Sequence, residues 1–292
     1  MRYAVVDTGS NTIRMSIYEY ENSGLTEIFT EAVFANLAGY IVDNSLCDDG
    51  ILACCDAIKK HLETAKEYNA DFHVFATAAI RNAKNSDEIV KKVKEISGID
   101  MKILSGADEG ELSFLGALED FPIDNGIMAD VGGGSSEIIA FEAKKIVAVE
   151  SIPLGSLKAY KTFVSGDIPT PEEAENIREE IKKHLDKNPK FKNIKTDNLC
   201  LVGGGIMAAF KLSSEILNSN TLTVSGVNTM LSIFITRPDA IKILESLIPE
   251  RKLTITPGLA IYSAIGKYFA AEKIHISNKG IKEGYTLKYL LH

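Results

Sequence analysis

The sequence predicts an α/β protein made of two similar lobes with a cleft between them. One order of elements, three consecutive strands followed by mixed helices and strands, occurs twice along the 292 residues. Asp7 and Asp130 hold equivalent places in the two halves, which indicates an internal duplication. No stretch between the halves is rich enough in Pro, Gly or Ser to be a flexible linker. We therefore expect packed lobes at residues 1–122 and 123–292, with the terminal helix able to pack back on the first lobe.

Strands of the first half are expected where apolar and β-branched residues cluster or alternate, and helices where apolar residues follow helical spacing. Gly98 is a suitable residue to end a helix, and Ser105 is a suitable residue to begin one. The expected strands are residues 1–7, 12–20, 24–34, 71–77 and 100–104, and the expected helices are 49–68, 87–97 and 105–121.

The second half follows the same rules and carries a strong helix signal at its centre. Thr170 is the expected N-cap there, because Pro171 follows it, acidic residues come early and basic residues come late. The expected strands are residues 127–131, 136–142, 145–152, 198–202 and 273–277, and the expected helices are 170–187, 203–213, 226–235, 238–248, 257–271 and 283–292.

Composition narrows the class of protein. Hydrophobic residues make up 45% and charged residues 25%, as in globular chains, and the net charge is −8. This charge speaks against non-specific binding to DNA or an anionic membrane, and no apolar run is long enough to span a bilayer. The four cysteines and five histidines show no metal-ligand spacing, so we expect buried, reduced thiols and a cytoplasmic protein.

Each of the two duplicated turns combines groups that bind phosphate. Residues 7–12, "DTGSNT", and 130–137, "DVGGGSSE", place Asp after an apolar run and Gly with hydroxyl or amide side chains directly after it. Backbone N–H groups of a tight turn can converge on phosphate oxygens, and the Asp can hold Mg²⁺. The candidate phosphate ligands are Gly9, Ser10, Asn11, Gly132, Gly133, Gly134 and Ser135, and the candidate metal ligands are Asp7 and Asp130.

The alternative is that each turn only reverses the chain in a hairpin. Asp, Gly, Ser and Asn favour turns in proteins of every function. The occurrence of the pair at equivalent positions favours a binding role for both.

The two turn motifs resemble the phosphate loops of the actin and hexokinase superfamily, and more narrowly those of the exopolyphosphatase/guanosine pentaphosphate phosphatase family. Three further segments resemble that family in the same order along the chain, "FATAAIRNAKN", "ILSGADEGELSFLGAL" and "ERKLTITPGLAIYSAI". The resemblance extends from Tyr3 to about Gly284. It implies a short member with two actin-like (ribonuclease H-like) lobes.

The resemblance implies a hydrolase that removes terminal phosphate from inorganic polyphosphate, guanosine pentaphosphate or both, with Mg²⁺. It assigns the proposed catalytic base to Glu109, with Asp108 before it. The alternative is that both carboxylates complement the positive end of a helix. A carboxylate at such a place is expected to keep a low pKa, which suits the positioning of water. The family also implies a homodimer.

Two arginines are candidates for neutralising phosphate charge. Arg14 follows the first turn and is assigned to phosphate binding, whereas Arg81 follows "ATAAI" and is assigned to catalysis. Surface salt bridges are the alternative for both. Glu137 is expected to join the metal ligands or to act as a second acid/base group.

Three positions depart from the family's pattern, and two other functions stay open. Gly205 stands where a Thr is usual, Asn278 where an Asp is usual, and Lys282 where an Arg is usual. These departures permit a non-catalytic sensor that binds guanosine tetra- or pentaphosphate. A kinase of the same superfamily, which would transfer phosphate from ATP to an acceptor, is the other alternative.

Overall fold

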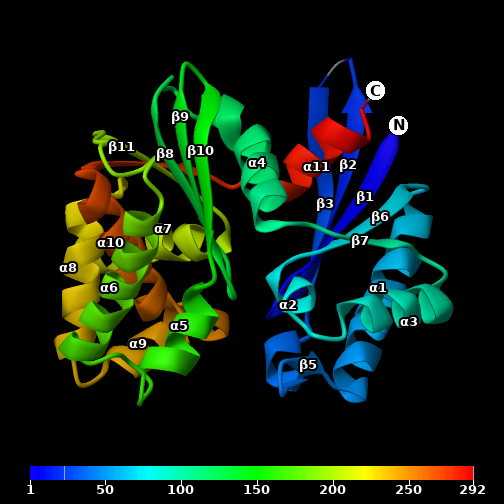
Figure 1. Cartoon of the computed structure of the whole chain (residues 1–292), viewed down its shortest axis with the longest axis horizontal. Helices are drawn as coiled ribbons and strands as arrows, with labels where there is room; N and C mark the ends of the chain where they lie inside the picture. Colours follow the sequence, from blue (N-terminus) through cyan, green and yellow to red (C-terminus); the bar gives the residue numbers. More distant parts are fainter. Residues whose placement is uncertain (23, 292) are drawn as a thin grey trace. The chain divides into compact units, whose positions relative to one another are not determined.

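The computed structural model describes residues 1–22 and 24–291, and these residues form two compact units (Figure 1). Unit 1 is Met1–Leu112 together with the C-terminal segment that begins at Lys282. Unit 2 is Ser113–Ile281. The end of the chain therefore belongs to the same unit as its beginning.

Unit 1 contains a mixed five-stranded sheet in the order β3-β2-β1-β6-β7. The first three strands form an antiparallel meander, and the last two run parallel to β1. The apolar runs of the sequence predicted these five strands at their places along the chain. The strands are β1 Arg2–Thr8, β2 Thr12–Glu21, β3 Gly24–Phe34, β6 Asp71–Ala76 and β7 Met101–Ile103.

One face of this sheet packs against helices α1 and α3, whose buried apolar residues form a single core with those of the strands. On α11, Tyr285 stacks on Phe75 of β6 with ring centroids 5.0 Å apart. The remaining elements of this unit are η1 Leu37–Tyr40, β4 Ile41–Val42, β5 Ser45–Leu46, α1 Asp48–Glu67, α2 Ala78–Arg81, α3 Ser86–Ser97, the first half of α4 Gly106–Ala117, and α11 Ile281–Tyr289 from Lys282 onward.

Unit 2 repeats the arrangement with the order β10-β9-β8-β11-β12. Alternate residues of these strands point to opposite faces, so Ala129 and Leu201 join one core while Met128 and Val202 join another. The strands are β8 Gly126–Val131, β9 Ser136–Glu142, β10 Lys145–Ile152, β11 Asn198–Val202 and β12 Lys273–Ser277.

The larger core of unit 2 is built around α10, which is buried along almost its whole length and packs on α5, α6, α7 and α8. The smaller core lies under the second half of α4, where Phe114 and Phe141 meet with ring centroids 5.2 Å apart. The helices are η2 Leu118–Asp120, α5 Ser156–Phe163, α6 Pro171–Lys187, α7 Gly204–Leu217, α8 Val224–Thr236, α9 Ala240–Leu247, η3 Pro249–Arg251 and α10 Ile255–Phe269.

The equal strand orders confirm the predicted α/β class with a duplicated lobe. In unit 1, Asp7 lies opposite Arg14 across the β1–β2 ladder. In unit 2, Asp130 lies opposite Glu137 across the β8–β9 ladder. Each candidate turn is thus the loop of the corresponding hairpin.

The predicted helix ends are confirmed. Thr170 accepts the N–H of Glu173, whose side chain accepts the N–H of Thr170, which makes a capping box. Gly98 ends α3 with a φ of 76°, a conformation that suits glycine. Ser105 accepts the N–H of Asp108 at the start of α4.

Helices α2 and α5 were not predicted, because four and eight residues are too few to show a helical period. All four cysteines are free, and three of them are buried as expected; Cys47 is half-buried. Within the described residues, no helix combines the length and apolar character needed to cross a bilayer.

Gly284 of α11 offers a test of how the terminal helix is held in unit 1. A Cβ there would lie 2.6 Å from the Leu112 carbonyl carbon, so backbone of α4 occupies the space. We expect Gly284→Ala to lower the free energy of unfolding by about 1–3 kcal/mol, measured by denaturant unfolding. Gly166→Ala is the matched control, because its Cβ would lie 3.9 Å from the nearest atom. Equal stabilities of the two variants would contradict this account.

Candidate functional site

The first candidate phosphate loop is the short turn between β1 and β2. The Gly9 N–H donates to the Thr12 carbonyl at 3.2 Å, and a Cβ on Gly9 would lie 3.0 Å from that oxygen. The Ser10 and Asn11 carbonyls accept backbone hydrogen bonds from residues 38 and 36, at 2.9 and 2.8 Å. Because N–H and C=O of a trans peptide point in opposite directions, the N–H of Asn11 points away from that segment.

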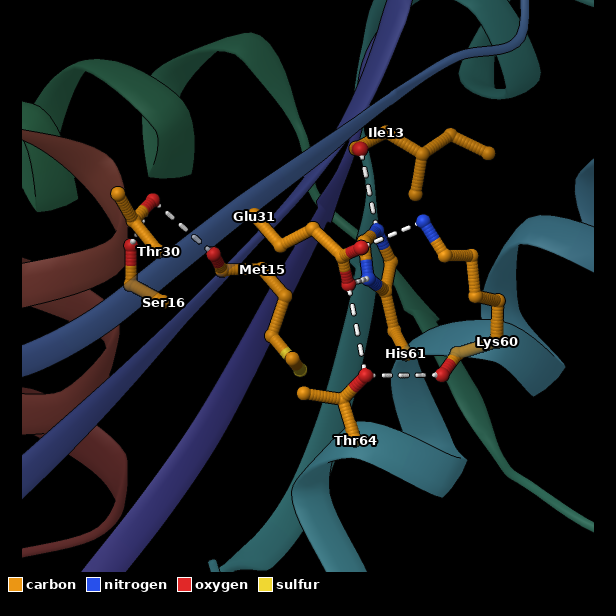
Figure 2. A network of polar contacts seen from close by, with 8 residues as sticks. All are labelled: Ile13, Met15, Ser16, Thr30, Glu31, Lys60, His61 and Thr64. Atoms are coloured by element: carbon orange, nitrogen blue, oxygen red, sulfur yellow. Dashed lines mark hydrogen bonds and ion pairs between the residues drawn. The ribbon is translucent and has the colours of Figure 1, made fainter. Parts of the chain in front are cut away.

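A buried histidine fixes strand β2 immediately after the turn (Figure 2). His61 of α1 has no exposed surface; its Nε2 lies 3.2 Å from the Ile13 carbonyl and its Nδ1 lies 3.3 Å from Glu31 Oε2. The Lys60 ammonium lies 2.5 Å from the other Glu31 oxygen, Oε1, and donates a hydrogen bond to it. This hydrogen bond is the main reason why the pKa of Glu31 is lowered. The network ties α1 to β2 and β3, so the loop starts from a fixed strand.

A lysine of the terminal helix lies in the polar centre of unit 1. The Lys282 ammonium donates to the Ser16 hydroxyl. Desolvation lowers the pKa of Lys282, whereas the charges of Glu283, Glu27 and Asp7, in decreasing order of effect, act in the opposite direction. The exposed Arg14 also adds positive charge here. The residue that departs from the family's pattern therefore brings a cation close to the first candidate turn.

Arg81 and Glu109 meet in unit 1 as an ion pair. Arg81, the last residue of α2, pairs with Glu109 in the first turn of α4 and also donates to the Leu104 carbonyl at 3.0 Å. Glu109 is 5% exposed. A guanidinium beside a buried carboxylate favours its charged form. Two residues selected separately from the sequence are thus in contact.

The neighbouring Asp108 has a different role. Its Oδ2 accepts hydrogen bonds from the Ser105 hydroxyl at 2.6 Å and from the Ser105 N–H at 3.1 Å. The hydrogen bond from the Ser105 hydroxyl is the main reason why the pKa of Asp108 is lowered. Asp108 therefore completes the cap of α4, while Glu109 pairs with Arg81 instead.

The second candidate loop, between β8 and β9 in unit 2, rests on the start of α5. The Gly132 and Gly133 carbonyls accept the N–H groups of Ser156 and Lys158, both at 2.9 Å. A Cβ on Gly155 would lie 2.5 Å from the Gly132 oxygen and 2.6 Å from the Gly133 carbonyl carbon. Gly155 thus allows the helix to support the loop. Sequence reasoning missed this residue, although the "LGS" before an apolar segment was a signal.

Glu137 lies at the start of β9 and is 4% exposed. It accepts a hydrogen bond from the Ser151 hydroxyl at 2.9 Å. Ser135, at the end of the loop, is also buried. The end of the loop and its following carboxylate are therefore buried in unit 2, whereas Gly132 at its beginning is exposed.

Asp130 is a desolvated carboxylate at the end of β8. Its Oδ2 accepts the Ser113 hydroxyl at 2.7 Å, and a Cβ on Gly203 would lie 3.1 Å from its Oδ1. Burial raises the pKa of Asp130 to about 6, and the hydrogen bond from Ser113 reduces this rise. Among the described residues, no ion pair to Asp130 is found.

The glycine turn before α7 belongs to the same part of unit 2. Gly203 has a φ of 94°, which only glycine adopts readily. The guanidinium of Arg251 lies directly on Gly204, so a side chain at this position would displace it. The sequence places Arg251 in the "ERKLTITPG" segment but predicts no role for it.

Asn278 is exposed and lies in a segment fixed by its neighbours. Ser277 and Lys279 both bind Asp120, each at 2.6 Å. At the third departing position, Gly205, a Cβ would lie 2.7 Å from the Tyr262 hydroxyl oxygen.

Side chains that could coordinate a divalent cation form no cluster among the described residues, where no three or more His, Cys, Asp or Glu side chains make up a metal-binding group. Mg²⁺ in phosphate-handling sites is often held by one or two carboxylates, with substrate oxygens and water completing its shell. Asp130 fits such a role, because it is an oxygen ligand whose charged form is disfavoured until a cation compensates it.

The sequence of almost the whole chain matches the model of one protein family. The model of the Ppx/GppA phosphatase family matches residues 16–292. The crystal structure of the Aquifex aeolicus member of that family superposes with a TM-score of 0.83 at 24% identity, covering 100% of this chain and 99% of the other. This likeness confirms the expected actin-like fold of the two lobes.

Two curated proteins are also similar. A bifunctional 3-dehydroquinate synthase/phosphatase of Fusobacterium nucleatum is 28% identical over 98% of this chain, which spans only 46% of that protein. Exopolyphosphatase 1 of Mycobacterium tuberculosis is 23% identical over 99% of this chain and 88% of the relative.

The raised pKa of Asp130 predicts a pH-dependent effect of its removal. Its folded pKa of about 6 exceeds the unfolded value of 3.8, so its contribution to stability is complete below pH 4 and is lost as the pH rises through 6. Asp130→Asn should therefore stabilise the metal-free protein above pH 6, on the order of 2 kcal/mol, and have little effect near pH 4.

Thermal unfolding in EDTA between pH 4 and 8 measures this difference. Added Mg²⁺ should raise the Tm of the wild type above pH 6 and leave the Tm of Asp130→Asn unchanged. A constant difference between the proteins at every pH would show that Asp130 does not titrate as described.

Proposed function

Because the chain belongs to the Ppx/GppA phosphatase family, we propose that it hydrolyses the terminal phosphoanhydride bond of inorganic polyphosphate, guanosine pentaphosphate or both. The observation that carries the proposal is the Arg81–Glu109 ion pair, which brings a buried carboxylate and a guanidinium together at the start of α4. The name of the mycobacterial relative, an exopolyphosphatase, supports inorganic polyphosphate as one substrate.

In the proposed reaction, Glu109 orients a water molecule and accepts its proton as the water oxygen attacks the terminal phosphorus. The new P–O bond forms while the anhydride P–O bond breaks, and the shortened chain leaves with the bridging oxygen. Arg81 holds Glu109 and offers positive charge to the equatorial oxygens. Phosphoryl transfer depends mainly on such positioning and charge neutralisation.

Each hairpin loop is proposed as a phosphate-binding site within its own unit. In unit 1 the proposed phosphate ligands are Gly9, Ser10 and Asn11, with Arg14 on the following strand. In unit 2 the proposed phosphate ligands are residues 132–135, where the start of α5 holds the Gly132 and Gly133 carbonyls and backbone N–H groups of the turn can bind anions.

We propose Mg²⁺ as the divalent cation, with Asp130 as the candidate ligand in unit 2 and Asp7 as a separate candidate ligand in unit 1. When bound, it would neutralise charge on the phosphate oxygens. Glu137 is proposed as a further ligand or as a second acid/base group. The homodimer and the cytoplasmic location stay predictions.

Glu109→Gln tests the role of the proposed base. Release of phosphate from short polyphosphate, long polyphosphate and guanosine pentaphosphate is measured with Mg²⁺. We expect kcat to fall by about 10²-fold or more in this variant, because Gln keeps the shape but cannot accept a proton. Glu111→Gln is the matched control on the same helix, since Glu111 pairs with Lys288 on the surface.

The other outcomes separate the alternatives. Equal release by Glu109→Gln and the wild type would leave hydrolysis standing and remove Glu109 from its role. Binding of guanosine polyphosphate with no release by either protein would favour the sensor. Transfer of the terminal phosphate of ATP to an added acceptor would favour the kinase.

A further inference from the structure

Tyr262 of α10 lies beneath the glycine turn that begins α7. The side chain is 1% exposed, and its ring belongs to the larger core of unit 2. A Cβ on Gly205 would lie 2.7 Å from the Tyr262 hydroxyl oxygen and 3.8 Å from the Val131 carbonyl oxygen. The hydroxyl therefore points out of the core, at the place where β8 ends and α7 begins.

Within the described residues no hydrogen bond to this hydroxyl is found, and its oxygen is not one of the fully buried atoms without a partner, so it can be reached from outside the core. The other fully buried tyrosine, Tyr18, donates to Glu283 at 2.6 Å. Phenylalanine would fill the same space in the core, since the hydroxyl makes no hydrogen bond to the described residues, so packing alone does not explain a tyrosine at this position.

The surroundings of the hydroxyl suit an anion. Helix α7 has 14 residues, and the N–H groups of its first turn have no intrahelical partners at its positive end. The guanidinium of Arg251 lies on Gly204 beside them. Burial raises the pKa of Tyr262, so the hydroxyl keeps its proton and can donate it. Nearby charges have smaller effects, Arg251 lowering that pKa and Asp130 raising it.

We propose that Tyr262 is a substrate-binding residue, whose hydroxyl donates its hydrogen bond to a phosphate oxygen held at the N-terminus of α7. The inference rests on the proposed function and adds a donor to the same site. It also explains Gly205, because any side chain there would displace the hydroxyl. The subsite takes a phosphoryl group of the substrate or inorganic phosphate, the product.

Tyr262→Phe separates this role from a structural one. Affinity for inorganic phosphate and for pyrophosphate is measured by calorimetry with Mg²⁺, and stability by thermal unfolding. We expect both dissociation constants to rise about 10-fold, since the lost hydrogen bond is to a charged group, while Tm changes little because no hydrogen bond within the protein is lost. KM for polyphosphate should rise more than kcat falls.

Tyr268→Phe is the matched control on the same helix, because its hydroxyl bonds to Asp186 at 3.1 Å on the surface. Its phosphate affinity should equal that of the wild type.

Three results would overturn the inference: equal phosphate affinities of Tyr262→Phe and the wild type, a lower Tm with unchanged affinity, or no phosphate binding by the wild type. If phosphate affinity falls as expected but no protein hydrolyses polyphosphate, the subsite stands and the proposed function fails.

Discussion

The register of two hairpins is the constraint on which the rest of the structure depends. In each sheet the ladder places an aspartate at the end of the central strand opposite a charged residue of the next strand, Arg14 in unit 1 and Glu137 in unit 2. A shift by one residue would turn every side chain of a strand to the opposite face of its sheet and so out of the core that it packs in, and core packing therefore fixes this register. The loop that follows each aspartate is consequently held in place by the packing of the whole sheet.

Both units contain buried charged side chains, and burial disfavours the charged form of each. Neighbouring groups compensate this effect to different degrees. Glu109 has Arg81, and Lys282 has the Ser16 hydroxyl and the negative charge of Glu283, with smaller effects of Glu27 and Asp7. Asp130 receives one hydroxyl hydrogen bond, and its pKa rises accordingly. Uneven compensation of this kind is common where a ligand supplies the missing charge.

Much of the fold could be predicted from the sequence, because strands, caps and turns depend on residues close together in the chain. Thr170 and Gly98 act as expected, since a cap needs only its own helix end. The predicted places of the ten sheet strands along the chain are likewise confirmed. Helix α2 was missed because it has only four residues, and the turn at Gly155 because its importance comes from the loop it contacts.

The sequence by itself determined the duplicated α/β plan, the two hairpin loops and the candidate charged residues. Only the tertiary structure decided how these residues combine. It paired Glu109 with Arg81 and gave the capping role to Asp108. It also placed the Tyr262 hydroxyl at Gly205. The physical reason is that these contacts join segments far apart in the chain, and their distances are set by packing of the core, which no local pattern records.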